Sequence, residues 1–288
     1  MQWSSLETAH RRRARLERSR DANRVSPTVP VQSNGGAEPV DDRRVDLAAA
    51  HAAPELLAIR DRLLVALAFS SGVFEAICFL SFGKVFTAFQ TGNLVFLGLG
   101  AAGTRPPAGP DPVRVVISLA AFAVGAALAA RILTALNGDD EIEDTDIFEA
   151  WPQRVSIALG VALVAQVGFL VVWMTMSPSS PVSNILVALN AFAMGLQMNA
   201  IRSLHVPGIS TTAATATYIS WVTGITTWTH KAAAARRLTG VLVGMAAGAF
   251  VGNWMLNHAH TYAPVLPVAV IALVVAIAFV TLRQEPAR

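Results

Sequence analysis

Two short polar motifs recur inside strongly apolar sequence, and they carry the side chains most able to do chemistry. Glu75 precedes a Thr-Gly-Asn motif by sixteen residues, and Asn199 precedes a Thr-Ala-Thr motif at the same spacing, an offset of 124 residues without a gap. A carboxylate exchanges protons or binds cations, whereas amides and hydroxyls donate and accept hydrogen bonds. Polar groups are costly inside a bilayer, so their repeated placement predicts a duplicated membrane protein with a polar site between its halves. The candidate solute- or ion-binding residues are Glu75, Thr91, Gly92, Asn93, Gln197, Asn199, Arg202, Thr215 and Thr217.

The acid at position 75 is expected to face the interior of a helix bundle. A charge near the centre of a membrane span costs about 2.5–3.5 kcal/mol on insertion scales. Glu75 is therefore expected to be protonated or paired, and Arg202 is a candidate partner. Two interpretations of the polar residues stay open. They hydrogen-bond one another and lock the helices, at about 0.6 kcal/mol for each bond, or they line a cavity that binds or conducts a solute.

Eight apolar windows supply the elements that position these motifs. Hydrophobic residues make up 53% of the chain and charged residues only 14%, against about 25% charged residues in soluble domains. Two windows, 85–103 and 209–228, are short or interrupted by polar residues. The others are long enough, at about 1.5 Å per residue, to approach or span a hydrocarbon core of about 30 Å. These long windows are 63–82, 113–136, 155–176, 182–204, 238–256 and 265–282.

The order long, short, long, long occurs twice and predicts the fold. We expect an all-α polytopic membrane protein with two sequence-related repeats, 63–176 and 182–282. Each repeat would hold three long transmembrane helices and one short, Thr/Gly-rich, broken or re-entrant helix. Six to eight crossings fit this pattern: six would invert one repeat relative to the other, and eight would leave the repeats parallel. The positive-inside rule fits both arrangements and places the N-terminus in the cytoplasm.

The starts of the two short helices are predicted ligand-binding positions. Free backbone amides at a helix start carry partial positive charge and offer donors to an anion or a carbonyl group. Non-helical backbone survives at membrane depth only where it is buried in protein or lines water. Two such helix starts near the midplane are typical of a transporter or channel.

A glycine stripe in window 238–256 predicts close helix packing. Four glycines recur at every fourth residue and form one face of a helix, and a weaker stripe of small residues lies in window 113–136. Small residues let helix backbones approach closely in lipid. A neighbouring helix of the same chain is the expected partner, with a homo-oligomer seam as the alternative. The stripe residues are Gly240, Gly244, Gly248, Gly252, Ala121, Gly125 and Ala129.

The remaining segments are polar. Half of the 22 basic residues precede position 63, so residues 1–45 are predicted to form a disordered, Arg-rich cytoplasmic tail. Residues 46–62 are a predicted amphipathic lead-in helix interrupted at Pro54, and 137–154 is an acidic loop. Since no aromatic or fold signal accompanies the arginines, nucleic acid is not an expected partner. No spacing of Cys and His predicts a metal site, and we expect neither a cofactor nor an enzyme activity.

These motifs resemble those of the YoaK family of bacterial integral membrane proteins, a domain-of-unknown-function family. The matching stretches are GVFEA at 72–76, FTAFQTGN at 86–93, GLQMNA at 195–200 and TTAATAT at 211–217, and the likeness extends over 63–282. Glu75 stands where the family usually has Asp, and Ala216 stands where the second copy often has Gly. The resemblance implies a polytopic inner-membrane protein and no established activity.

Two functions follow from these observations as hypotheses. The first is a small-solute transporter or channel-like protein in which Glu75 couples proton movement to solute binding. The second is a non-transporting membrane sensor or assembly partner that acts through the tail 1–45 on cytoplasmic factors or anionic lipid. The expected partners are the lipid bilayer and a small solute or proton.

Overall fold

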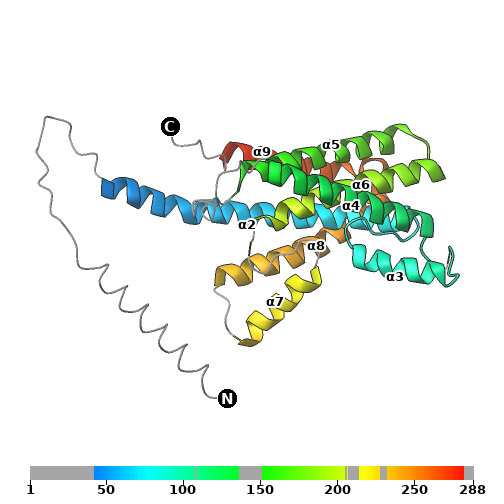
Figure 1. The fold of residues 1–288 in the computed structure, drawn as a ribbon, viewed down its shortest axis with the longest axis horizontal. Coiled ribbons are helices and arrows are strands. Elements are labelled where there is room, and N and C mark those ends of the chain that lie inside the picture. The colour runs from blue at the N-terminus through cyan, green and yellow to red at the C-terminus, as the bar shows by residue number, and fades with distance from the viewer. Residues whose placement is uncertain are drawn as a thin grey trace, which may run out of the picture. The chain divides into compact units, whose positions relative to one another are not determined.

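Every regular element of the described chain is helical (Figure 1). The computed structural model describes residues 42–107, 109–135, 151–204, 206, 214–227 and 232–281, and side chains from Pro54 onward. From Leu47 onward the described helices belong to one unit, Leu47–Arg288. Most of the predicted tail 1–45, most of the acidic loop and the stretch 207–213 lie outside the described residues. The elements are α2 Asp42–Ser81, α3 Gln90–Ala101, α4 Pro112–Ala135, α5 Gln153–Thr175, α6 Ser180–Arg202, α7 Ala214–Thr227, α8 Ala232–His258, η2 His260–Tyr262 and α9 Val265–Thr281.

Six helices of the described chain are long and apolar enough to cross a membrane, which confirms the prediction of a polytopic all-α protein. They are α2 from Pro54 onward, α4, α5, α6, α8, and the stretch His260–Thr281 that contains α9. The short helices α3 and α7 have 12 and 14 residues. At 1.5 Å per residue they extend roughly 18 and 21 Å, well short of a core of about 30 Å. Of the predicted six to eight crossings, the structure therefore supports six.

The first helices of the two predicted repeats run antiparallel. Ser71 of α2 contacts Gln197 of α6, whereas Cys78, further along α2, contacts Asn190, which comes earlier in α6. Residue numbers that rise on one helix thus fall on the other. This is the arrangement expected when three spans separate the two helix starts.

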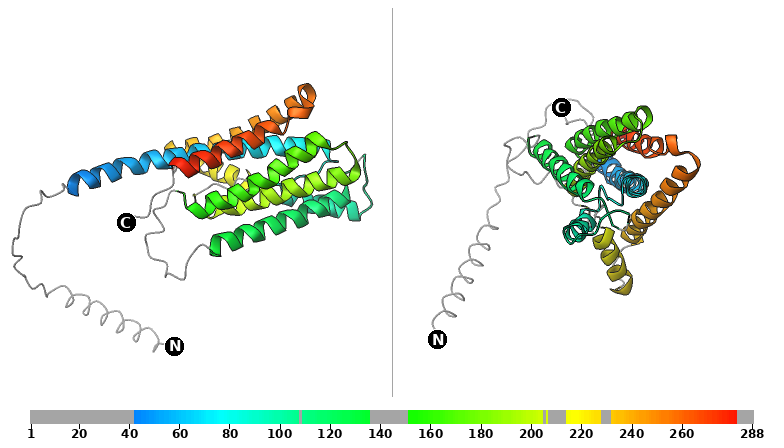
Figure 2. Two further views of the ribbon diagram at one scale, coloured as in Figure 1. Left: turned by 90° about the horizontal axis from the view of Figure 1, so that it is seen from above. Right: turned by 90° about the vertical axis from the view of Figure 1, so that its right-hand side faces the viewer.

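Helix α2 is the most enclosed span. The buried share of its most apolar window is 67%, against 22% for both α4 and α8, and the end-on view places it among α5, α6, α8 and α9 (Figure 2). Phe74 packs edge-on against Phe169 of α5, with ring centroids 5.5 Å apart. The helix continues through Pro54, so the predicted interruption at this residue is wrong, although an interior proline removes one backbone hydrogen bond.

Local sequence explains where helices begin. The side chain of Asp111 accepts hydrogen bonds from Val113 N at 3.0 Å and Arg114 N at 3.3 Å, which caps the start of α4. Ser179 caps α6 in the same way through Val182 N at 3.4 Å. Side-chain oxygens at these positions satisfy amides that have no partner within the helix.

The glycine stripe of α8 packs against α2 of the same chain. A Cβ on Gly248 would overlap the carbonyl oxygen of Phe69, and one on Gly252 would lie 2.7 Å from the carbonyl oxygen of Val73. In return, a Cβ on Gly72 would overlap the carbonyl oxygen of Met245. The two backbones therefore approach as closely as glycine alone permits, which is the role that small residues serve between helices in lipid.

Helices α4 and α6 form a matching contact. A Cβ on Gly125 would overlap the carbonyl oxygen of Phe192, and one on Gly195 would overlap that of Phe122. Ala129 is also fully buried here, while Ala121 is partly buried. Helix α2 thus packs on α8, and α6 packs on α4, so each predicted repeat contributes one helix to each contact.

These two contacts correspond residue by residue at an offset of 123. Gly72 corresponds to Gly195 and Gly125 to Gly248, and their carbonyl partners follow the same offset. The polar motifs of the sequence instead align at an offset of 124. Successive residues point about 100° apart around a helix. The two offsets therefore bring different faces of the corresponding helices into alignment. The duplication itself stays a prediction.

Candidate functional site

A non-helical segment, residues 82–89, lies between α2 and α3 inside the bundle. The chain reverses at Gly83 and Lys84, whose φ angles of 78° and 61° lie in the left-handed region. Lys84 N bonds to the carbonyl oxygen of Phe79 and closes the turn. Residues 85–89 then have no helical partners for their backbone groups, so side chains must supply them.

The carboxylate of Glu75 supplies acceptors to this segment. Its Oε1 accepts from Thr87 Oγ1 at 2.6 Å, Ala88 N at 2.6 Å and Thr87 N at 3.0 Å. Glu75 is only 4% exposed and Thr87 is fully buried. The prediction that Glu75 faces the bundle interior is confirmed, and its partners are a hydroxyl and two backbone amides.

Asn93 binds the backbone of Phe86, the residue before Thr87. Its Oδ1 accepts from Phe86 N at 3.1 Å, and its Nδ2 donates to Phe86 O at 2.7 Å. Ser118 of α4 also donates to Phe86 O, at 2.6 Å, and Gln90 Nε2 donates to Thr87 O at 2.8 Å. The backbone of residues 86–88 is therefore bound by side chains from α2, α3 and α4.

Thr87 joins this group to α6. Asn190 Nδ2 donates to Thr87 Oγ1 at 2.8 Å and also contacts Cys78 Sγ at 3.3 Å. An amide NH₂ only donates, so the single proton of Thr87 is directed to Glu75. Asn190 lies near the middle of α6, which places the linked residues Glu75, Thr87 and Asn190 close to half the depth of that span. We call these three residues the Glu75 network.

Three buried amide side chains near the centres of α5 and α6 keep open hydrogen-bonding atoms. Among the residues that the structure describes, Asn190 Oδ1, Gln197 Oε1 and both polar atoms of Gln166 have no partner, although each residue is at most 1% exposed. Gln197 Nε2 donates to Ser71 Oγ at 3.0 Å. Buried polar atoms without partners are uncommon in native proteins, and water or a ligand is the usual explanation.

Several predicted site residues do not join the Glu75 network. Thr91 is exposed at the start of α3, and Gly92 is partly buried there. Asn199 donates instead to Ala126 O of α4, at 2.8 Å. Arg202 is exposed near the end of α6 and forms no ion pair with Glu75. Thr217 is fully buried at the start of α7, and the side chain of Thr215 lies outside the described residues.

Asn199 also differs from Glu75 in its place on the helix. At the 123-residue offset of the glycine contacts, Asn199 corresponds to Ala76, and both lie against the stripe helix of their contact. The two polar residues therefore do not meet. The prediction that Glu75 and Asn199 share a polar site was wrong, because an alignment of the two motifs does not indicate which helix face each residue occupies.

Thr87 and Ser118 are two members of the site that the list of candidate residues lacked. Both are fully buried hydroxyl residues. Thr87 was detectable in principle, since it lies in the stretch just before a short helix, where non-helical backbone was expected. Ser118 had no such signal, because a single serine in an apolar window usually bonds its own helix.

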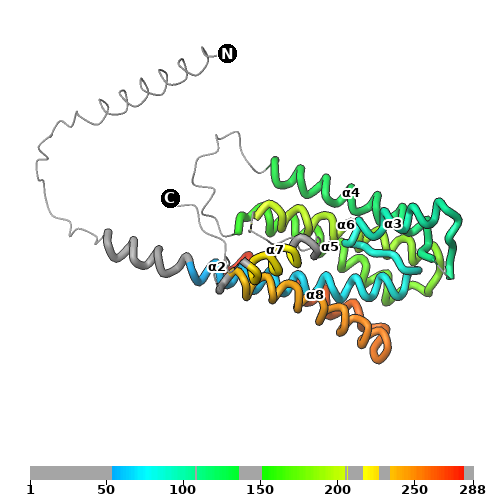
Figure 3. Tube along the Cα trace, turned by 90° about the horizontal axis from the view of Figure 1, so that it is seen from below, coloured from blue at the N-terminus to red at the C-terminus, as the bar shows by residue number. Residues whose placement is uncertain are grey.

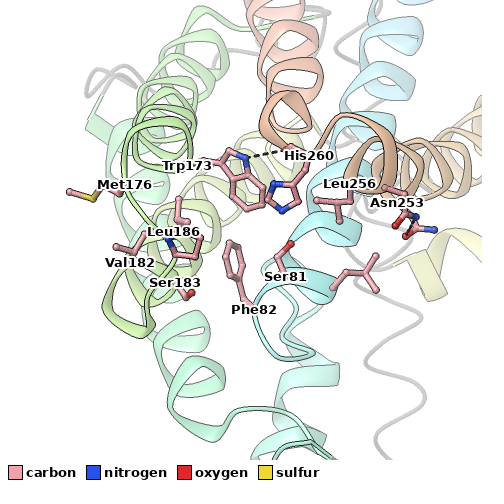
Figure 4. A pocket seen from close by; sticks show the side chains of 13 residues that line it. Ser81, Phe82, Trp173, Met176, Val182, Ser183, Leu186, Asn253, Leu256 and His260 are labelled. Carbon is pink, nitrogen blue, oxygen red and sulfur yellow. Dashed lines mark hydrogen bonds between the residues drawn. The ribbon is translucent and has the colours of Figure 1, made fainter.

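A cavity of about 470 Å³ opens at the end of the bundle where α2 finishes (Figure 4). It lies between α2, the α5–α6 connection and the end of α8. Trp173 and His260 stack at its rim with ring centroids 4.9 Å apart, and Trp173 Nε1 donates to the carbonyl oxygen of His260 at 3.3 Å. Phe82 and Leu186 line the cavity. Each lies four residues from a residue of the contact between α2 and α6, Phe82 from Cys78 and Leu186 from Asn190. We call this contact the α2–α6 seam.

The side-chain chemistry argues for hydrogen bonding rather than metal binding. The described residues contain no group of three or more His, Cys, Asp or Glu side chains that could hold a metal ion. The polar side chains that line the cavity include Asn253, Asn257 and His260, and of these three His260 is the common metal ligand. Within this part of the chain, the arrangement can accept hydrogen bonds from a solute through carboxylate and amide oxygens.

Comparisons with known proteins confirm the resemblance seen in the sequence. A family model described as a protein of unknown function (DUF1275) matches residues 63–278. The UPF0700 transmembrane protein YoaK of Bacillus subtilis (strain 168) is 34% identical over 163 residues. That alignment covers 57% of this chain and 66% of the relative, so the chain spans just under two thirds of the relative's length. No solved structure matches the chain.

Proposed function

The chain belongs to this DUF1275 family, and we propose from its own geometry that it is a transporter or channel for a small polar solute. The solute would pass along the seam between α2 and α6. By the positive-inside rule, we place the protein in the bacterial inner membrane with its N-terminus in the cytoplasm. A role as an enzyme is not part of the proposal.

The observation that carries the proposal is the non-helical backbone near half the depth of α6. The Glu75 network holds this backbone through Thr87, with Asn93 clamping Phe86 beside it. Such backbone at membrane depth is tolerated where it is enclosed by protein or lines a polar pathway. Binding sites of transporters commonly form where broken helices meet near the midplane.

The acceptor atoms without partners along the α2–α6 seam indicate which class of solute would bind there. Asn190 Oδ1 and Gln197 Oε1 lie seven residues apart on α6 and therefore on one face of it, and neither acceptor has a partner in the described part of the chain. With the carboxylate of Glu75 they present oxygen atoms to the interior. Oxygen acceptors favour a solute rich in hydrogen-bond donors, such as a small protonated amine.

Glu75 is proposed to couple solute movement to a proton. When ionised, it accepts three hydrogen bonds from residues 87 and 88 through Oε1. A proton on the carboxyl group turns one acceptor into a donor. That change weakens the hold on the segment 85–89 and frees it to move, as an alternating pathway requires.

The cavity at the end of α2 is the proposed access route. Phe82 and Leu186 line it, and they lie four residues from Cys78 and Asn190, which meet across the seam. Phe82 also packs against Trp173, with ring centroids 6.0 Å apart. A change in the rotamer of Phe82 would join the cavity to the seam.

Flux in proteoliposomes tests the proposal. Purified protein is reconstituted, a pH gradient is imposed, and uptake of monovalent cations and small amines is followed. We expect Glu75→Gln to keep the fold, because its amide oxygen still accepts hydrogen bonds, and to lose the dependence of flux on the pH gradient. Glu55→Gln makes the same change at an exposed position of α2 and serves as the control.

Two outcomes count against the proposal. Folded wild-type protein that moves none of these solutes contradicts transport, and equal pH dependence in the two variants contradicts the coupling role of Glu75. Deletion of residues 1–45 tests the alternative, a sensor or assembly partner that acts through its basic tail. That alternative predicts loss of cellular function with unchanged flux.

A further inference from the structure

We propose that α2 and α8 form a binding site for a phosphate-bearing anion, the headgroup of an anionic phospholipid, at the end of the bundle opposite the aromatic cavity. This site does not depend on the transport proposal, because it involves none of the residues of the α2–α6 seam. The two helices lie side by side in this region (Figure 3).

A cavity of about 620 Å³ lies between the first turns of the two spans. Arginines 62, 236 and 237 line it together with Asp61, and Leu57 and Val65 form an apolar wall. The spans begin at Pro54 and Ala234, so the cavity lies where the membrane interface meets the helices. A long basic side chain at this level places its apolar stem toward lipid and its charged end toward the headgroups.

The charges of the cavity are not balanced by its own acid. Asp61 contacts Arg60 at 3.1 Å through Oδ1 and Arg237 at 3.4 Å through Oδ2. The carboxylate is thus shared by two guanidinium groups. Arg62 and Arg236 are exposed and have no ion pair or hydrogen bond to any other residue that the structure describes. Three arginines and one aspartate leave the cavity with an excess of positive charge.

The residue types favour an oxyanion, and the apolar wall favours one that is carried by a lipid. Guanidinium groups match phosphate oxygens through paired hydrogen bonds, and they give up their hydration more readily than an ammonium group does. The apolar wall of Leu57 and Val65 suits the glycerol and upper acyl chain of a lipid, which free phosphate lacks. Basic pockets between transmembrane helices are suited to anionic headgroups.

Lipid-dependent thermal stability of the full chain tests the site. Protein in detergent is titrated with phosphatidylglycerol, with phosphatidylcholine or with inorganic phosphate, and the unfolding midpoint is recorded. We expect phosphatidylglycerol to raise the midpoint and phosphatidylcholine to leave it unchanged. In the double variant Arg62→Gln/Arg236→Gln, the half-saturating phosphatidylglycerol concentration should rise about 30-fold, which corresponds to about 2 kcal/mol.

Arg131→Gln is the matched control, since Arg131 is an exposed arginine near the end of α4, outside the cavity. It should respond to phosphatidylglycerol as the wild type does. Protection by inorganic phosphate alone that the double variant loses would support the anion site and replace lipid with free phosphate as its occupant. Equal protection by both lipids, or full phosphatidylglycerol protection in the double variant, would overturn the proposal.

Discussion

Replacing Asn93 with Ala tests whether one side chain holds the non-helical segment in place. Asn93 bonds both backbone groups of Phe86, at 3.1 and 2.7 Å. In the variant, Phe86 O keeps its bond from Ser118 at 2.6 Å, whereas Phe86 N loses its partner among the described residues. A buried donor without a partner costs about 1–3 kcal/mol. We therefore expect the segment to open more easily by about 2 kcal/mol, which is about 30-fold in population.

The single cysteine of the chain supplies the assay. Cys78 is fully buried and contacts Asn190 across the seam, so a maleimide reaches its thiol only when the seam opens. Labelling of purified protein is followed by mass spectrometry under conditions where all variants stay folded by circular dichroism. The variant should label about 30-fold faster than the wild type when opening and closing are fast relative to the labelling step, because the rate then follows the open population.

Thr134→Ala is the control for this measurement, because Thr134 is an exposed residue near the end of α4 whose hydroxyl bonds its own helix backbone, outside the segment's contacts and the cavity. It should label at the wild-type rate. If Asn93→Ala also labels at that rate, the clamp on Phe86 does not restrain the segment, and the reasoning about the buried amide is refuted.

Two further substitutions test the packing and the network. Gly248→Leu should lower the free energy of unfolding by about 3 kcal/mol or more, because the carbonyl of Phe69 leaves no room for a side chain. Gly98→Leu, on a face with nothing within 4 Å, should melt like the wild type in the same detergent, and similar melting of both variants would contradict the close approach. Thr87→Val removes the hydroxyl between the α2 carboxylate and the α6 amide and should cost about 2 kcal/mol in chemical unfolding. The exposed Thr91→Val should change that free energy by less than about 0.5 kcal/mol, and equal losses would count against the network.

The membrane helices were predictable because length and apolarity suffice to identify a span. The window 155–176 corresponds to α5, Gln153–Thr175, and the window 182–204 to α6, Ser180–Arg202. The buried position of Glu75 was also predictable, since a carboxylate in such a window is costly anywhere else. Short windows were predicted less accurately: the window 85–103 corresponds to a non-helical segment followed by α3, which starts only at Gln90.

The partners of the buried acid were not predictable in the same way. Arg202 was the obvious counter-charge by type, yet Glu75 bonds to Thr87 and Ala88. That choice depends on the backbone path of residues 82–89, which has no periodic pattern to interpret. Asn199 shows a second limit. A one-residue difference in register decides which neighbour a side chain meets, and an ungapped match of letters carries no information about that register.

The crossed packing of α2 on α8 and of α6 on α4 has a consequence for how the chain is made. The ribosome completes α2 long before the glycine face that receives it exists. The amino-terminal half can therefore enter the bilayer but has no finished interior of its own. Helix α2 can pack fully only after α8 has been synthesised and inserted, so membrane insertion and tertiary assembly are separate steps for this protein.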